Sequence, residues 1–314
     1  MRAPAADRRS PIVSVVTPLY NSADFIGTTL ESLQAQTFGE WEAILVDDGS
    51  TDDTPQRVRR FLEDERFSYL RQDNQGIAAA RNRGIRAARG AWIALLDHDD
   101  LWMPEKLERQ LEAAERNDWD IICTEGEILR DGRRTRYSDH LPEQTRQALS
   151  RPDDPSVDVF ELLVRTNFLC ASSVLLRRSL FDDHGVLDPA LAPADDYDMW
   201  LRCTPHAPLG YLMDPLVVYV LHTTNHSWKT VEMRVATIRA LVRAREHCVG
   251  DDARTRTWVD ALTVHHAVLF RELMRRRAYH RVAAHAARLG PYGVQGLRIL
   301  VRAWRLRHRV RAGF

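Results

Sequence analysis

The sequence predicts an α/β fold in which a mostly parallel sheet is flanked by helices and followed by a C-terminal helical extension. Three apolar runs, at residues 11–17, 41–46 and 91–95, have the length of buried strands. Segments with apolar residues at helical spacing lie between them. Strands that alternate with helices indicate a parallel sheet with right-handed crossovers, and such sheets bind ligands beyond the carboxyl ends of their strands.

The first 125 residues carry this alternation most clearly. Helices are expected at residues 22–37, 53–65, 77–89 and 104–117, and a further strand at 120–124. Pro104 stands at the start of the last of these helices, where its missing N–H would have no helical partner in any case. We therefore expect residues 1–125 to form the first half of an α/β domain.

The composition of the chain changes after residue 125. The sequence predicts a polar hairpin around Asp131 and Gly132, then a loop-rich stretch at 138–156. Further helices are expected at 157–165 and 195–203, and further strands at 173–176 and 216–221. Residues 230–314, interrupted mainly at Gly250 and at 289–291, predict three or more helices.

The overall composition is that of a folded globular protein, with 44% hydrophobic and 28% charged residues among 314. No apolar run approaches the roughly 18 residues of a membrane-spanning helix, and residues 1–10 lack the apolar core of a signal peptide. We therefore expect a cytoplasmic protein, with peripheral contact at the inner face of the membrane as an alternative. The four cysteines form no Cys-x-x-Cys pair, which predicts reduced packing residues.

Charge is distributed unevenly along the chain. Residues 231–314 contain 18 arginines against 6 acidic residues, whereas residues 1–230 contain 26 basic and 38 acidic residues. An acidic body argues against nucleic acid as a partner and suits a metal-dependent site. Within the basic tail, residues 292–314 have the pattern of a basic amphipathic helix. This helix would either dock on an anionic membrane or pack its apolar face on residues 1–230 or on a second subunit of a homo-oligomer. We favour packing, because helix faces of this width usually close a core.

A cluster of carboxylates, Asp97, Asp99 and Asp100, follows the third apolar run. Carboxylate oxygens bind Mg²⁺ or Mn²⁺, and the ion in turn neutralises phosphate charge. A solvated loop would explain an isolated Asp-x-Asp equally well. Polar residues also follow the other two runs, at 18–21 and 47–50, so we expect the three strand ends to share one crevice.

Five blocks of the sequence then resemble a known family. They are residues 15–21 (VVTPLYN), 46–52 (VDDGSTD), 76–84 (GIAAARNRG), 96–100 (LDHDD) and 195–202 (DDYDMWLR). Their order and spacing are similar to those of family-2 inverting glycosyltransferases with the GT-A fold, over about residues 11–228. The resemblance implies a nucleotide-sugar-binding half at 1–125, an acceptor-side half at 126–229 and a basic helical extension at 230–314.

The resemblance implies that one set of residues holds the nucleotide: Thr17, Pro18, Tyr20, Asp48, Arg81, Asp97 and His98. An Asp48 carboxylate that accepts the imide N–H of uracil would favour a UDP-sugar. Two local alternatives remain. In the first alternative, Asp48 is only part of a turn and binds no base. In the second, Arg81 is a helix residue exposed to solvent.

Asp99 resembles the metal ligand of the family, with Mn²⁺ or Mg²⁺ as the implied cofactor. The first carboxylate of the pair, Asp97, would reach the ribose or the metal through water. The cation would assist departure of the nucleoside diphosphate. We expect Asp100 instead to cap the helix near Pro104 or to support the loop.

Asp196 resembles the general base that removes a proton from the acceptor hydroxyl, and Asp195 departs from the usual Glu. Both carboxylates would also suit a helix N-terminus as capping groups. Trp200 would either face the acceptor or pack in the core. Core packing is the more usual role of an aromatic residue on a helix. His222 resembles a histidine that approaches the diphosphate or metal, although Val220 replaces a frequent Arg nearby; a surface histidine is the alternative. Residues 167–173 resemble a segment on the acceptor side.

The resemblance therefore implies an enzyme that moves a sugar from a nucleotide-sugar to an unidentified acceptor hydroxyl, in cell-surface polysaccharide or glycolipid synthesis. Two alternatives stay open: a sugar-nucleotide-binding protein without turnover, and a sugar-nucleotide nucleotidyltransferase. The second usually has a Gly-rich basic loop after its first strand, and residues 17–21 contain neither Gly nor Lys. A dinucleotide oxidoreductase is disfavoured because no Gly-x-Gly-x-x-Gly follows that strand.

Overall fold

The computed structural model describes residues 10–151, 154, 156–222 and 230–275. The chain divides into two compact units. The first, here called the sheet unit, comprises Met1–Ser156, Phe168–Pro189 and His206–Thr223. The second, here called the helical unit, comprises Val157–Asn167, Ala190–Pro205 and Thr224–Phe314. The helical unit thus takes two segments from the middle of the chain as well as its end.

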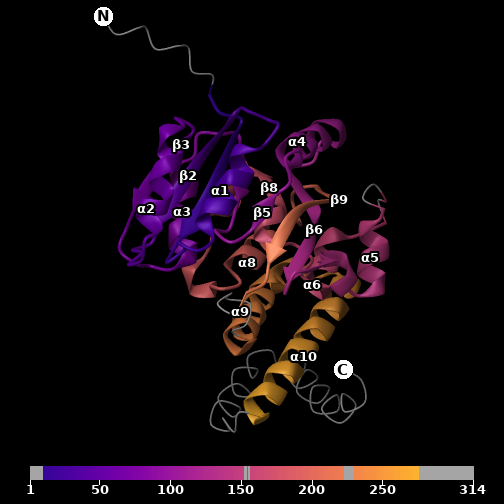
Figure 1. Cartoon of the computed structure of the whole chain (residues 1–314). Coiled ribbons are helices and arrows are strands. Elements are labelled where there is room, and N and C mark those ends of the chain that lie inside the picture. The colour runs from indigo at the N-terminus through magenta and orange to yellow at the C-terminus, as the bar shows by residue number, and fades with distance from the viewer. Residues whose placement is uncertain (1–9, 152–153, 155, 223–229, 276–314) are drawn as a thin grey trace, which may run out of the picture. The chain divides into compact units, whose positions relative to one another are not determined.

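The strands of the described residues form one mixed sheet, parts of which are labelled in Figure 1. The strand order is β3-β2-β1-β4-β8-β6-β9-β5, with β7 paired to β6. Their bounds are β1 Val13–Leu19, β2 Trp41–Asp47, β3 Phe67–Arg71, β4 Trp92–Leu95, β5 Leu101–Trp102, β6 Ile121–Arg130, β7 Arg133–Arg136, β8 Val174–Arg177 and β9 Leu209–Val220. Strands β1 to β4 are mutually parallel, and β8 runs antiparallel to β4 and β6. The predicted mostly parallel arrangement therefore holds for the first half of the chain.

Helices connect the strands of the sheet unit. They are α1 Ile26–Gln34, α2 Thr54–Arg59, α3 Ile77–Ala87, α4 Lys106–Asn117, α5 Glu143–Leu149 and α7 Ser179–His184. The helical unit contains α6 Val159–Arg165, α8 Asp195–Cys203, α9 Thr230–Arg243 and α10 Asp252–Arg275. The expected C-terminal helical extension is thus present in α9 and α10, whereas residues 292–314, predicted to form a basic amphipathic helix, lie outside the described residues.

The core of the sheet unit lies around β1, β2 and β4, in which every residue is buried. Helix α3 packs closely on β1, because a Cβ added at Gly84 would lie 2.3 Å from Cγ1 of Val16. Only glycine allows this approach. The close packing fixes α3, and with it Arg81 one turn earlier, beside the carboxyl ends of the strands.

Several elements differ from the sequence expectations. Strand β3 was not expected. Among the described strands it pairs with β2 alone, and it is half-exposed, so it lacks a continuous apolar run. Strand β6 runs through the expected strand at 120–124 and into the hairpin, whose turn is at Asp131 and Gly132 as predicted. Short helix α5 lies in the stretch expected to be loop-rich.

The four cysteines are free thiols, and three of them, Cys123, Cys203 and Cys248, are buried. This agrees with the prediction that they serve packing. Within residues 10–151, 156–222 and 230–275, no helix combines the length and the apolar character needed to cross a bilayer.

Candidate active site

The three polar strand ends lie at one edge of the sheet, as the sequence predicted. Strands β2, β1 and β4 are adjacent and parallel, with Leu19 opposite Asp47 and Val16 opposite Leu95. The backbone N–H of Leu96 donates to the carbonyl of Val16 at 3.0 Å, which extends the pairing to the start of the acidic turn. The loops after these strands therefore meet in a single region.

The loop after β1 is fastened to the loop after β2. The backbone N–H of Asn21 donates to Ser50 Oγ at 3.0 Å, and Asn21 Oδ1 accepts the backbone N–H of Thr51 at 2.9 Å. Asn21 has a φ of 49°, a left-handed conformation that Asn tolerates well. The preceding Tyr20 is 48% exposed, so a large ring is presented to solvent at this edge.

Asp47 and Asp48 hold two different parts of the backbone. Asp47 Oδ1 accepts the backbone N–H of Ser50 at 2.7 Å, which makes Asp47 the turn residue. Asp48, 3% exposed, accepts the backbone N–H groups of Gln75 at 2.9 Å and Gly76 at 2.7 Å, and also the side-chain amide of Gln72 at 2.8 Å. Asp48 thereby organises the loop that leads into α3. Three of its roughly four acceptor positions are already used by the chain.

Thr17 and Pro18 do not face solvent. Thr17 has no exposed area, and its Oγ1 has no hydrogen-bond partner within the described residues. Pro18 is also buried, because β1 lies between β2 and β4 and is covered on both faces. The expected contact of these two residues with a nucleotide is thus not accessible in this structure.

Arg81 and Asp97 form an ion pair. Arg81 Nη2 lies 2.6 Å from Asp97 Oδ1; the arginine side chain is only 4% exposed and the aspartate 21%. The interpretation of Arg81 as a solvated helix residue is therefore wrong. The pair joins α3 to the end of β4 and leaves part of the Asp97 carboxylate accessible.

Asp99 contacts His222, which lies just after β9. His222 Nε2 is 2.8 Å from Asp99 Oδ2, and the side chains are 17% and 10% exposed. The imidazole stacks on the ring of Phe25, with centroids 4.3 Å apart and an interplanar angle of 18°. The interpretation of His222 as a surface histidine is therefore wrong. His98, between the two carboxylates, has its carbonyl fixed by Thr29 Oγ1 at 2.8 Å.

Asp100 is fully buried below the turn. It accepts hydrogen bonds from Ser172 Oγ at 2.5 Å and from the backbone N–H of Val220 at 3.3 Å. Burial, together with the negative charges of Asp99 and Asp97, raises the pKa of Asp100 well above its usual value. Asp100 does not cap α4, whose N-cap is Glu105 without a side-chain hydrogen bond, and it supports the acidic loop instead.

The residues at this edge fit a divalent cation only in part. Within the described ranges, no three His, Cys, Asp or Glu side chains form a ready-made metal cluster. Mg²⁺ in phosphate sites commonly takes one or two carboxylates, with its other ligands from phosphate and water. The side chains of Asp97 and Asp99, 21% and 10% exposed, match this type of site.

In the helical unit, Asp195 and Asp196 begin α8 but do not cap it. The N-cap is Ala194, without a side-chain hydrogen bond, and the two carboxylates lie in the first turn. Asp195 has no exposed area, while Asp196 is partly exposed and its Oδ1 accepts the backbone N–H of Tyr197 at 2.7 Å. Negative charge in a first turn is favoured by the helix dipole, which is the part of the capping interpretation that remains valid.

Helix α8 is fixed by its neighbours α9 and α6. Fully buried Asp198 lies 2.9 Å from Arg202 Nε and 3.2 Å from Nη1 of Arg243 on α9. The hydroxyl of Tyr197 donates to the carbonyl of Leu163 at 2.8 Å. Trp200 has no exposed area, so it packs in the core and does not offer a surface to a sugar.

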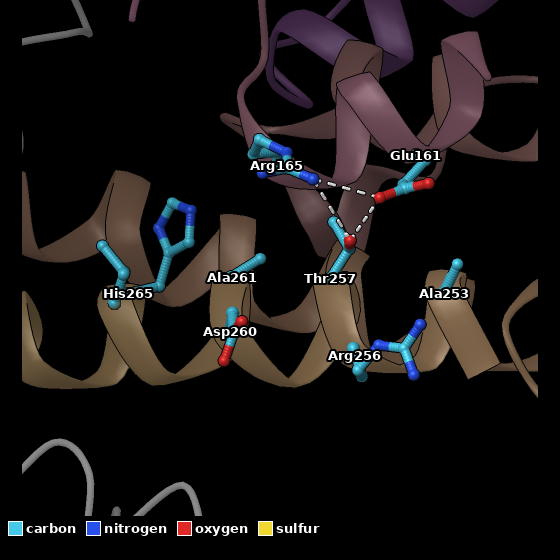
Figure 2. A pocket seen from close by; sticks show the side chains of 9 residues that line it. Glu161, Arg165, Ala253, Arg256, Thr257, Asp260, Ala261 and His265 are labelled. Carbon is cyan, nitrogen blue, oxygen red and sulfur yellow. Dashed lines mark hydrogen bonds and ion pairs between the residues drawn. The ribbon is translucent and has the colours of Figure 1, made fainter. Parts of the chain in front are cut away.

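A hollow of about 390 Å³ lies in the helical unit, between α6 and α10. Figure 2 shows the side chains that line it. In it, Glu161 Oε1 accepts from Arg165 Nη2 at 3.0 Å and from Thr257 Oγ1 at 2.5 Å. None of the predicted site residues lines it. In the sheet unit a smaller pocket is lined in part by Phe168, Cys170 and Ser173, members of the segment expected on the acceptor side.

Comparison with known proteins identifies relatives along most of the chain. The family model described as glycosyl transferase family 2 matches residues 14–185. The putative glycosyltransferase EpsH of Bacillus subtilis is 32% identical over 222 residues, which cover 69% of this chain and 62% of EpsH. The succinoglycan biosynthesis protein ExoO of Rhizobium meliloti is 32% identical over 259 residues, covering 78% of this chain and 70% of ExoO.

A third relative is similar over a shorter region. The putative teichuronic acid biosynthesis glycosyltransferase TuaG of Bacillus subtilis is 46% identical over 105 residues, which cover 32% of this chain and 41% of TuaG. The chain therefore spans less than two thirds of the length of both EpsH and TuaG.

Solved structures share the fold at low sequence identity. S. aureus TarS 1-349 in complex with UDP-GlcNAc superposes with a TM-score of 0.60 at 18% identity, covering 82% of this chain and 81% of that one. The mannosyltransferase PcManGT from Pyrobaculum calidifontis, in complex with GDP-Man and Mn²⁺, gives a TM-score of 0.59 at 17% identity, covering 96% and 88%. These likenesses confirm the predicted GT-A fold.

Proposed function

Because this chain belongs to glycosyl transferase family 2, we propose that it transfers a sugar from a nucleotide-sugar to an acceptor hydroxyl. The observation that carries the proposal is the acidic turn at the edge of the sheet. There Asp97 is paired with Arg81 and Asp99 with His222, while both carboxylates remain partly accessible. A single strand end thus offers two oriented carboxylates to a diphosphate-bound cation.

The donor is a UDP-sugar in this proposal. Tyr20 presents its exposed ring at the sheet edge, where a base can stack. Asp48 has about one acceptor position beyond its three bonds to the loop before α3, and a uracil imide N–H would use it. Because Asp48 is only 3% exposed, this contact requires the loop before α3 to move when the donor binds. TarS was solved with UDP-GlcNAc and PcManGT with GDP-Man, so guanosine is the base to test against uracil.

Asp99 would hold Mn²⁺ or Mg²⁺, with Asp97 reaching the ion or the ribose through water. When bound, the cation supplies positive charge that stabilises the departing nucleoside diphosphate. The chain's own residues set the geometry. Arg81 orients Asp97, and the imidazole of His222, stacked on Phe25, orients Asp99.

Asp196 is the general base in this proposal. The acceptor oxygen forms a bond to the anomeric carbon while the bond from that carbon to the diphosphate oxygen breaks, and the acceptor proton moves to Asp196. One such in-line displacement inverts the anomeric centre and needs no protein nucleophile. Partial exposure of Asp196, on a helix anchored through Asp198 and Arg243, supports this role.

The relatives favour synthesis of a cell-surface polysaccharide, since ExoO and TuaG are named for succinoglycan and teichuronic acid biosynthesis. Glycolipid synthesis, at the cytoplasmic face of the membrane, is the variant of this proposal in which the acceptor is a lipid-linked sugar. A binding protein without turnover is the second candidate. It is disfavoured because both the metal-side Asp99 and the candidate base Asp196 are present.

Two variants test the proposal. UDP-, GDP- and dTDP-sugars are first screened for Mn²⁺-dependent binding by thermal shift, and donor consumption is then assayed. Asp99→Ala should lose metal-dependent binding, whereas Asp196→Asn should keep binding and lose transfer by about 100-fold or more, as expected for a general base. Exposed Asp183 on α7 supplies the control Asp183→Ala. Wild-type binding and activity in both test variants would overturn the assignment.

A further inference from the structure

We infer that Ser172 is the residue that positions the metal-binding turn, an inference that rests on the proposed function. Ser172 lies 75 residues from Asp97 in the chain, in a 3-10 turn at Ala171–Ser173, and has no exposed area. It is closed off from solvent. Its contribution is to hold the backbone from which the carboxylates of Asp97 and Asp99 project.

The Ser172 hydroxyl links the two ends of the acidic turn. Its Oγ accepts the backbone N–H of Asp97 at 3.1 Å and donates to Asp100 Oδ2 at 2.5 Å. An N–H cannot accept a hydrogen bond, so the hydroxyl proton is directed to the carboxylate. The Ser172 hydroxyl thereby bridges Asp97 and Asp100, the first and last residues of the turn. This turn also contains a bond from Asp100 N–H to the Asp97 carbonyl, at 3.2 Å.

The backbone around Ser172 is held independently of its hydroxyl. Trp102 Nε1 donates to the Ser172 carbonyl at 2.8 Å, and Gln110 Nε2 donates to the adjacent Ser173 carbonyl at 2.9 Å. Strand β5 and helix α4 thus fix this 3-10 turn through two neighbouring carbonyls. Removing only the hydroxyl of Ser172 should leave the turn in place and free the Asp97 end of the acidic loop.

Ser173 supplies a matched control. It belongs to the same 3-10 turn and is 3% exposed, but its hydroxyl donates to the Cys170 carbonyl at 2.7 Å and lies 3.0 Å from Cys123 Sγ. Neither of these two contacts involves residues 97–100. Ser173→Ala therefore removes a buried serine hydroxyl nearby without touching the loop.

The experiment titrates Mn²⁺ against UDP binding by calorimetry in the wild type, Ser172→Ala, Ser173→Ala and Asp99→Ala. Ser172→Ala removes both hydrogen bonds of the hydroxyl and should raise the Mn²⁺ concentration for half-maximal UDP binding about tenfold, because the Asp97 amide is no longer held. Ser173→Ala should stay within about twofold of the wild type, a change smaller than one typical hydrogen bond.

Amide hydrogen exchange adds a local readout. The Asp97 amide should exchange faster in Ser172→Ala but not in Ser173→Ala, whereas general destabilisation would speed exchange throughout the sheet. Rapid exchange of this amide in the folded wild type would overturn the inference even if Ser172→Ala fails to fold. A second outcome would overturn the inference while leaving the proposed function intact. In that outcome Asp99→Ala loses binding, but Ser172→Ala and Ser173→Ala need the same Mn²⁺ concentration for half-maximal UDP binding. No Mn²⁺-dependent nucleotide binding by the wild type would overturn both.

Discussion

His222 Nε2 lies 2.8 Å from Asp99 Oδ2, although 123 residues separate the two in the sequence. Asp99 follows β4 and His222 follows β9, so the contact links the acidic turn to the last strand of the sheet unit. The ring of Phe25 stacks on the imidazole from the loop before α1. Three separate segments therefore determine the orientation of one carboxylate.

His222→Ala should weaken the response to metal. Without the imidazole, Asp99 loses a group that orients its carboxylate, so the Mn²⁺ concentration for half-maximal UDP binding should rise about tenfold. His222→Gln, which retains a donor to the carboxylate, should lie between the alanine variant and the wild type. Calorimetry measures both. Exposed His140 provides the control His140→Ala, and an equal response of His140→Ala and His222→Ala would contradict the assigned role.

Arg81→Ala should destabilise the fold as well as weaken nucleotide binding. Breaking a buried ion pair costs about 3–5 kcal/mol, and the partial exposure of Asp97 reduces this to roughly 2 kcal/mol here. Urea unfolding measures the change. Arg86→Ala, at an exposed position on the same helix, should change the free energy of unfolding by less than about 0.5 kcal/mol. A similar loss in both variants would mean that the Arg81–Asp97 pair contributes little.

The sequence predicted the sheet edge well because its signals are local. Continuous apolar runs mark strands buried on both faces, and β1, β2 and β4 are such strands. The carboxylates that follow β4 were found by the same local pattern. Strand β3 was not predicted because an edge strand with exposed residues has no continuous apolar run.

The partners of the site residues could not be predicted in the same way. Burial of Arg81, the contact of His222 with Asp99, and the link from Ser172 to Asp97 all join residues that are distant in the chain. No periodicity or spacing encodes these contacts, since they depend on which strands become neighbours. Burial of Thr17 likewise follows from the central place of β1 in the sheet, which a single strand pattern does not reveal.

Gly84→Ala should destabilise the sheet unit by about 1–3 kcal/mol, the usual cost of an inserted carbon in a tightly packed core. The new Cβ would lie 2.3 Å from Val16 Cγ1, so α3 must move away from β1. Such a movement would also displace Arg81 from Asp97 and should lower UDP affinity. Gly39→Ala is the control, because nothing lies within 4 Å of a Cβ there. Equal melting temperatures for the two variants would show that α3 adjusts without cost.

Lys106 should make stability depend on pH between about 7 and 9. Its side chain is fully buried, with Nζ 2.7 Å from Gln110 Oε1 and 4.0 Å from the centroid of the Trp102 ring. Burial lowers the pKa of Lys106 from 10.5 to about 7. Above pH 7 the unfolded chain binds a proton at this lysine that the folded chain lacks, so the free energy of unfolding rises with pH in this window.

Lys106→Met should remove that rise, because it retains an apolar chain over Trp102 and cannot titrate. The rise itself is expected to be about 2 kcal/mol between pH 7 and 9, close to 1.4 kcal/mol for each pH unit. Buried Cys123 has the opposite effect on the free energy of unfolding. Burial raises the pKa of its thiol from 9.0 to about 12, so this thiol lowers the free energy of unfolding mainly above pH 9. Urea unfolding of both proteins at pH 7 and pH 9 measures the difference. Parallel pH profiles for the wild type and Lys106→Met would mean that the buried amine is already neutral at pH 7 or is charged through pH 9.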